Sequence, residues 1–148
     1  MEKYLNTYKE TRRKIKAYSY FGWLMGWDQE TEAPERSVEY RTKQYQVFAE
    51  DMYQIQSNPE YMEAIEKLYE NLDQLEDPDF KVEIKNVYKD LRFVKKVPKD
   101  ELIAYRVLTS QASQIWAKAK EENNFEAFAP TLEKIVTFNK KLVKYLET

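Results

Sequence analysis

One stretch departs from the helical pattern of the rest of this sequence: Gly22-Trp23-Leu24-Met25-Gly26-Trp27-Asp28-Gln29-Glu30-Thr31-Glu32-Ala33-Pro34. It holds both glycines of the chain and two of its three tryptophans. The uncharged run Ala17–Trp27, eleven residues long, precedes three alternating acids and a proline. We therefore expect a long first helix, from about Lys3 to Gly26, that ends in an irregular segment over Trp27–Ala33.

Outside this stretch, apolar residues recur at steps of three and four, and prolines mark the breaks. The pattern predicts an all-α fold of about six antiparallel helices in one helical-hairpin or bundle domain that spans residues 1–148. After the first, we expect helices from about Pro34 to Gln56, after Asn58-Pro59, after Asp77-Pro78, from Pro98 to Asn123, and from Ala129-Pro130 onward. Phe125 to Phe128 is expected to form a turn, because a proline six residues into a helix costs about 3 kcal/mol.

The charges of the chain nearly cancel, with 24 basic and 26 acidic residues. No sequence-wide field would attract nucleic acid or anionic lipid, so we expect neither nucleic acid nor membrane as a partner. The basic segment Arg12-Arg13-Lys14 is read as a solvated helix face. The longest uncharged run is far below the ~20 apolar residues that cross a bilayer, and the N-terminus has no apolar signal core, which predicts a cytoplasmic protein.

Cysteine and histidine are both absent. The first absence excludes disulfides and thiol chemistry. The second removes the commonest general base, the commonest transition-metal ligand and any HExxH zinc motif. We therefore expect no catalytic residue and no bound metal in this chain.

Asp28, Glu30 and Glu32 are the strongest candidates for chemistry. On an extended backbone the three carboxylates would lie on one side, as in a site for a hard cation or for acid–base catalysis. On a helix, residues two apart do not face each other and the cluster does not form. The favoured interpretation is that these acids cap the end of one helix and the start of the next.

Gly22 and Gly26 form a G-x-x-x-G step, for which the favoured interpretation is the close approach of another helix backbone. Aromatic residues surround the same end of the helix almost completely, so we expect it to be buried on more than one side, if necessary by a second domain. The aromatic residues are Tyr18, Tyr20, Phe21, Trp23 and Trp27.

Three segments resemble, in the same order, the N-terminal region of the carboxypeptidase Taq family of thermostable zinc carboxypeptidases. The most specific is Leu24-Met25-Gly26-Trp27-Asp28-Gln29-Glu30-Thr31 with Pro34 after two residues, and the others are Val97–Leu102 and Ile115–Lys134. The residues taken from this signature, as packing residues, are Gly22, Gly26, Trp27, Asp28, Gln29, Glu30, Thr31 and Pro34. The family commonly has a glycine- and proline-rich turn after this signature, whereas the chain has Glu32-Ala33-Pro34-Glu35-Arg36.

The resemblance implies a part of a longer, mostly helical metallopeptidase that removes C-terminal residues from peptides with a divalent metal, usually zinc, held by HExxH and a later glutamate. Without histidine, none of these residues can be assigned here. Two hypotheses follow. In the first, the chain is the N-terminal, cleft-forming part of such an enzyme, inactive alone, with the missing C-terminal catalytic region as its partner and possible self-association. In the second, it is a freestanding helical protein-interaction module without enzymatic activity. The helical pattern still running at Lys144–Thr148 is compatible with the first.

Overall fold

The computed structural model describes residues 1–147, and within them it contains six α-helices and two short 3₁₀ turns. In chain order they are α1 (Glu2–Thr31), η1 (Glu35–Ser37), α2 (Val38–Gln56), α3 (Pro59–Glu70), η2 (Leu72–Gln74), α4 (Pro78–Lys96), α5 (Lys99–Glu121) and α6 (Phe125–Glu147). The all-α prediction is confirmed. Thr148, where the predicted helical pattern ends, lies outside the described residues.

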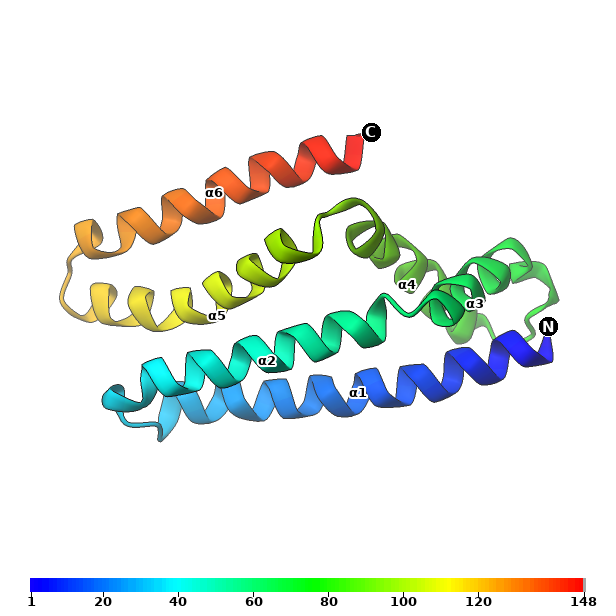
Figure 1. The fold of residues 1–148 in the computed structure, drawn as a ribbon, viewed down its shortest axis with the longest axis horizontal. Coiled ribbons are helices and arrows are strands. Elements are labelled where there is room, and N and C mark those ends of the chain that lie inside the picture. Colours follow the sequence, from blue (N-terminus) through cyan, green and yellow to red (C-terminus); the bar gives the residue numbers. More distant parts are fainter. Residues whose placement is uncertain (148) are drawn as a thin grey trace.

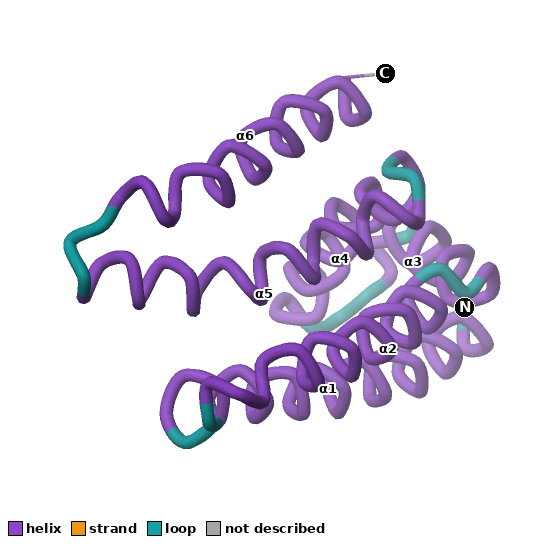
Figure 2. The backbone as a smooth tube through the Cα atoms, turned by 60° about the vertical axis from the view of Figure 1, so that its left-hand side comes forward, coloured by secondary structure: helices purple, strands orange, loops and turns teal. Residues whose placement is uncertain are grey.

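The long helix α1 supports one side of the molecule, and α2 and α3 follow it one after the other (Figure 1). α4 packs on α3, and α5 lies between α6 and the α1–α2 pair (Figure 2). Successive helices are therefore neighbours in the pairs α1–α2, α3–α4 and α5–α6. The antiparallel bundle predicted from the sequence would place every successive pair side by side, but α2–α3 and α4–α5 are not paired in this way. α2 and α3 lie end to end, because α1 is long enough to pair with both.

The hydrophobic core lies under the N-terminal half of α1. Tyr8 and Ile15 are the buried residues of this helix, and both belong to that half. They pack against α3, α4 and the end of α2, and the other buried members of the cluster are Met52, Tyr61, Ala64, Ile65, Leu68, Leu75, Ile84, Val87 and Leu91. The C-terminal half of α1 thus extends beyond the main core.

Two helix starts follow directly from the sequence. Asn58 Oδ1 accepts hydrogen bonds from the backbone N–H groups of Glu60 and Tyr61, at 2.9 and 3.1 Å. Asp77 Oδ1 does the same for Asp79 and Phe80, at 2.9 and 3.3 Å. Each cap satisfies N–H groups that have no partner within the helix, and a proline with a preset φ follows it. Both predicted starts are confirmed.

The end of α1 differs from the prediction. No glycine in the described residues adopts a positive φ, and the helix runs through Gly26 to Thr31. The Thr31 hydroxyl donates to the Trp27 carbonyl at 2.8 Å, and the backbone N–H of Ala33 donates to the Asp28 carbonyl at 2.8 Å. The irregular segment expected over residues 27–33 is therefore mostly helix. Pro34 ends the helix, because a proline disfavours helical geometry in the residue before it.

The start of α6 differs as well. This helix begins at Phe125 and contains Pro130, where a turn before the proline was expected. Asn123 has a φ of 51°, and the Asn124 N–H donates to the Ala119 carbonyl at 2.7 Å, which closes α5. Asn124 Oδ1 then accepts from the Ala127 N–H at 3.2 Å, which caps α6. This cap offsets part of the cost of the internal proline.

Candidate functional site

A groove of about 610 Å³ lies between the C-terminal half of α1, the start of α2 and the middle of α5. Its lining residues are Gly22, Leu24, Met25, Gly26, Asp28, Gln29, Glu30, Tyr40, Arg41, Gln44, Tyr45, Thr109, Ser110 and Ser113. Five of the signature residues are among them. The most specific sequence motif of the chain therefore forms one wall of this groove.

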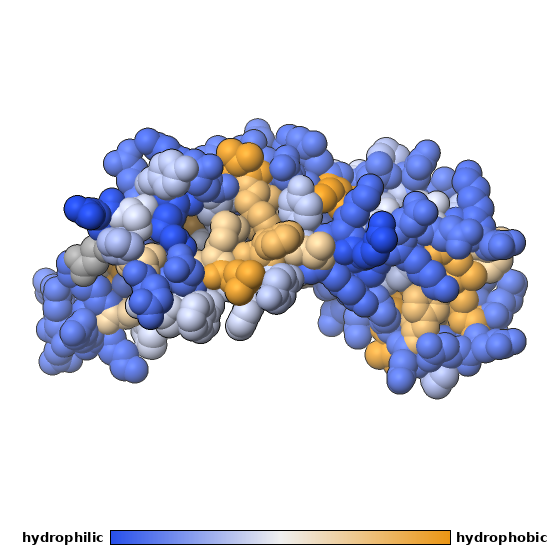
Figure 3. All heavy atoms as spheres, turned by 90° about the horizontal axis from the view of Figure 1, so that it is seen from below, coloured by the Kyte–Doolittle hydropathy of each residue, from blue (hydrophilic) through white to orange (hydrophobic). Residues whose placement is uncertain are grey.

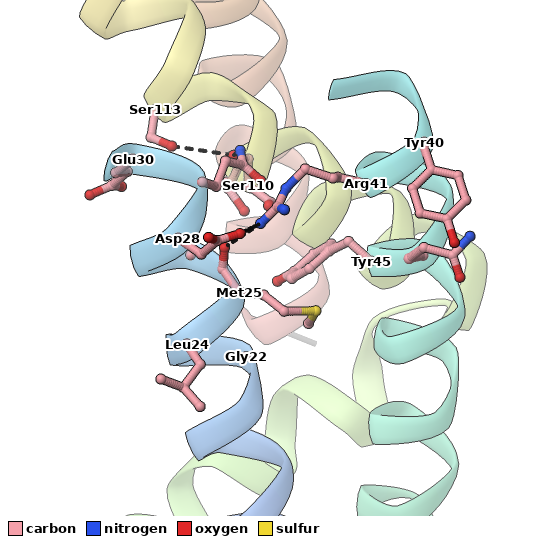
Figure 4. Close-up of a pocket in the computed structure, with 14 residues that line it drawn as sticks. Gly22, Leu24, Met25, Asp28, Glu30, Tyr40, Arg41, Tyr45, Ser110 and Ser113 are labelled. Carbon is pink, nitrogen blue, oxygen red and sulfur yellow. Dashed lines mark hydrogen bonds and ion pairs between the residues drawn. The ribbon is translucent and has the colours of Figure 1, made fainter. Parts of the chain in front are cut away.

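Arg41 connects the two helices that border the groove. Its Nη2 atom lies 2.6 Å from Asp28 Oδ2 and donates to the Met25 carbonyl at 3.1 Å. Figure 4 shows this side chain reaching from α2 to α1, with Ser110 of α5 beside it. Because nearly half of the Asp28 side chain is accessible to water, the ion pair adds little to the stability of the fold. Its main effect is to hold α1 and α2 in position beside the groove.

Glutamine side chains connect α5 to the other two helices. Gln29 Nε2 donates to the Ser110 carbonyl at 3.4 Å, and Gln114 Nε2 donates to the Gln29 carbonyl at 3.3 Å. Gln111 Nε2 donates to Thr42 Oγ1 at 3.1 Å. These bonds fix the third side of the groove, so the signature residue Gln29 has a positioning role.

The three acids after Trp27 do not converge. Asp28 pairs with Arg41, whereas the Glu30 side chain projects from a different side of α1 in Figure 4. Because the backbone is helical through Thr31, residues two apart face different directions. Among the described residues, no group of three or more acidic, histidine or cysteine side chains could hold a metal ion. The extended-backbone alternative is wrong.

The two glycines have different surroundings. A Cβ atom at Gly22 would lie 3.0 Å from Phe48 Cζ of α2, so the close neighbour is a side-chain ring and not the expected helix backbone. At Gly26 a Cβ atom would meet nothing within 4 Å. The expectation of close packing is therefore wrong at Gly26, which lies beside the groove. The signature residues Thr31 and Pro34 do not contribute to this packing: Thr31 is the last residue of α1, and Pro34 directly precedes the turn η1.

Sequence reasoning missed Arg41 and the α5 residues Ser110, Gln111, Ser113 and Gln114. A signal existed for Arg41, because it lies on the same helix face as Val38 and Tyr45, where an apolar residue is expected. An arginine at such a position usually reaches a carboxylate. The α5 residues carry no comparable signal, since ordinary polar positions of a helix have the same composition.

The outer side of the C-terminal half of α1 carries exposed aromatic residues. Trp23 is 61% exposed and Trp27 is 53% exposed, where burial on more than one side was expected. Tyr20 stacks on Trp23, with ring centroids 6.1 Å apart. We call this set the α1 aromatic surface, and its members are Tyr20, Phe21, Trp23, Leu24 and Trp27. Seen from below α1, apolar residues gather near the middle of the molecule, separated by hydrophilic residues from a second apolar area (Figure 3).

A polar cluster joins α1 to α4 at the core. Glu83 Oε1 accepts hydrogen bonds from the Tyr8 hydroxyl at 2.8 Å and from Arg12 Nε at 2.9 Å. Burial acts to raise the pKa of Glu83, but these two hydrogen bonds, together with the positive charges of Lys16 and Arg12, lower that pKa below its ordinary value. Burial raises the pKa of the neighbouring Tyr61 to about 12. The cluster does not line the groove, and its hydrogen bonds hold α1 against α4 beside the core.

These observations define an all-helical unit with a preformed groove and an exposed aromatic surface, but without a metal centre in its described residues. The chain belongs to the carboxypeptidase Taq (M32) metallopeptidase family, whose family model matches residues 7–148. It corresponds to the N-terminal region of that family, as the sequence resemblance predicted.

Two relatives show how much of the family the chain represents. It is 34% identical over 133 residues to Carboxypeptidase 1 of Bacillus subtilis, covering 90% of this chain and 26% of the relative. It is 26% identical over 136 residues to Thermostable carboxypeptidase 1 of Pyrococcus furiosus, again covering 90% of this chain and 26% of the relative. The chain thus spans about a quarter of the length of these relatives.

Solved structures agree with the fold. The BsuCP crystal structure matches with a TM-score of 0.84 at 32% identity, over 97% of this chain and 29% of that one. Metallocarboxypeptidase 1 of Trypanosoma cruzi matches with a TM-score of 0.67 at 23% identity, over 95% of this chain and 28% of that one. The second match concerns the fold alone. No helix among the described residues has the length and apolar character to span a membrane.

Proposed function

We propose that this chain is the N-terminal, cleft-forming part of a zinc-dependent metallocarboxypeptidase that removes C-terminal residues from peptides. The observation that carries the proposal is the groove beside the family signature, between α1, α2 and α5. Its volume of about 610 Å³ lies within the range of ligand pockets, roughly 300–1,000 Å³. The groove forms one wall of the peptide cleft, and the catalytic region is the partner that closes it. A cytoplasmic location stays a prediction.

The lining of the groove suits a peptide chain. Met25 and Tyr45 supply apolar contact, while Gln29 and Ser113 place polar groups along the same walls. A peptide presents both kinds of surface, since its backbone needs hydrogen-bond partners and its side chains vary. Arg41 keeps α1 and α2 at a fixed separation through Asp28 and the Met25 carbonyl. A preformed wall of this kind holds a peptide without selecting one side chain.

The residues present do not fit a zinc site. The sequence has no histidine or cysteine, and the acids near the groove do not converge. Metal and catalytic groups therefore come from the catalytic region in the full-length enzyme. This chain contributes binding and shape, and no chemical step is assigned to it.

The competing proposal of a freestanding interaction module is less well supported. A module that functions alone is expected to cover its large apolar side chains, whereas Trp23 and Trp27 are more than half exposed. Exposure at this level favours a unit whose surface is completed by another part of the same fold.

The proposal is tested by transplanting residues 7–148 into Carboxypeptidase 1 of Bacillus subtilis in place of the matching segment. We expect the chimera to release C-terminal residues from peptides in a chelator-sensitive manner. A folded, metal-loaded chimera without this activity would contradict the proposal. The unmodified relative and its deletion variant without the segment are the references.

The groove itself is tested in the same chimera with Ser113→Phe, which fills the groove from α5. We expect KM for peptides to rise about tenfold with little change in kcat, because binding is lost equally in the ground and transition states. Ala117→Phe, one turn further along α5 and exposed, is the matched control and should leave KM unchanged. Equal KM values for the two variants would place the peptide elsewhere.

A further inference from the structure

We propose that the α1 aromatic surface is the docking surface for the catalytic region of the enzyme. This inference rests on the proposed function and assigns the contact between the two parts to particular residues. Tyr20, Trp23 and Trp27 are separated by steps of three and four, so they form one stripe along α1. All three are more than half exposed.

The stripe lies on the part of α1 that the chain itself does not cover. The buried residues of the helix, Tyr8 and Ile15, both precede the first residue of the stripe, Tyr20. Gly22 and Met25 lie on the other side of the helix, where they line the groove that α1 forms with α2 and α5. In this part of α1, several large aromatic side chains therefore face solvent, within a run of eleven residues without a charge.

The length of the related enzymes indicates what covers this surface. In the BsuCP structure the matched unit continues into further chain, since this chain covers 29% of it at a TM-score of 0.84. A helical unit of this kind must meet the remaining polypeptide over some of its surface, and large aromatic side chains are the residues that dominate such contacts. Among the described residues, the α1 aromatic surface is the largest group of exposed aromatic side chains on one helix.

The stripe also indicates the chemistry of the surface it meets. Lys9 and Arg13 are exposed and lie on the same side of α1, in the turns that precede Tyr20. A complementary surface is therefore apolar opposite the tryptophans and carries carboxylates opposite these two cations. Leu24 belongs both to this surface and to the groove lining, so a docked catalytic region reaches the rim of the groove.

The test uses the triple variant Tyr20→Ser, Trp23→Ser, Trp27→Ser in two proteins, the 148-residue chain and the chimera. In the isolated chain, at a concentration low enough for it to be monomeric, we expect the melting temperature to change by no more than about 2 °C, because exposed side chains contribute little to folding. In the chimera we expect it to fall by about 5 °C or more, with loss of activity at the assay temperature. Phe125→Ser, which removes an exposed aromatic residue of α6, should affect neither protein.

The outcomes separate the inference from the proposed function. An active chimera that tolerates the triple variant would overturn the docking surface and leave the proposed function intact, whereas a folded but inactive parent chimera would contradict the proposed function. Binding to vesicles of phosphatidylcholine and phosphatidylserine, if it disappears in the triple variant, would show a membrane surface as the occupant and would also overturn the inference. We expect no vesicle binding.

Discussion

At the scale of single residues, Glu83 joins α1 to α4 by accepting from both Tyr8 and Arg12. Its pKa in the folded protein is below the usual 4.5, so the ionised carboxylate favours the folded state. This stabilisation is present above pH 4.5 and is lost as the pH falls through the folded-state pKa. We expect Glu83→Gln to lower the free energy of unfolding at pH 7 by about 1–2 kcal/mol.

The same substitution should also flatten the loss of stability in acid, since the titrating group is gone. Urea titrations between pH 3 and about pH 7 measure both effects. Glu10→Gln, an exposed carboxylate of α1, serves as the control. An unchanged acid profile in Glu83→Gln would show that other carboxylates determine it.

The two glycines of α1 give a second prediction at this scale. Alanine favours a helix interior over glycine by about 0.5–1 kcal/mol, and a Cβ atom at Gly26 meets open space. Gly26→Ala should therefore raise the melting temperature by about 2–4 °C. At Gly22 the Phe48 ring must move, although it packs against Tyr18 and Tyr45 at centroid distances of 5.7 Å. An equal gain in Gly22→Ala would contradict this account of the packing.

At the scale of elements, the N-cap residue of α3 should contribute measurably to the free energy of unfolding. Asn58 Oδ1 satisfies two N–H groups at the start of α3. Asn58→Ala should lower the free energy of unfolding by about 1 kcal/mol. Asn86→Ala removes an exposed amide from the interior of α4 and should cause no loss, because alanine is the better helix former. Chemical denaturation of both variants checks the difference.

Helix boundaries could be predicted from the sequence where the residues that set them are close together in the chain. Asn58-Pro59 and Asp77-Pro78 start helices through bonds within three residues, and both starts were predicted. The end of α1 was misjudged because a glycine only permits a break, whereas Pro34 enforces one. The start of α6 was misjudged because the Asn124 cap outweighs a general rule about Pro130.

Only part of the groove could be predicted from the sequence, because two of its walls depend on residues far apart in the chain. Its α1 wall was marked by the signature, but its α2 and α5 walls depend on contacts between residues far apart, such as Arg41 with Asp28 and Gln114 with Gln29. Such pairs arise from helix placement, which short-range patterns do not encode. The exposure of Trp23 and Trp27 was likewise missed, because a sequence shows that a residue is apolar and not what covers it.

At the scale of the whole molecule, an uncovered aromatic surface should make the isolated chain associate with itself. We expect light scattering to show a mass that rises with concentration, because apolar side chains left without their partner find another copy. The triple variant Tyr20→Ser, Trp23→Ser, Trp27→Ser should remain monomeric over the same range. A concentration-independent monomer of the unmodified chain would favour the freestanding module.

In the proposed function, this chain supplies the shape of a peptidase cleft and the catalytic region supplies its catalytic groups. One assay tests it most directly: release of C-terminal residues from peptides by the pure chain and by the chimera, each with Zn²⁺ or Co²⁺ and with a chelator. We expect no release by the chain alone and chelator-sensitive release by the chimera. Chelator-sensitive release by the pure 148-residue chain would contradict it.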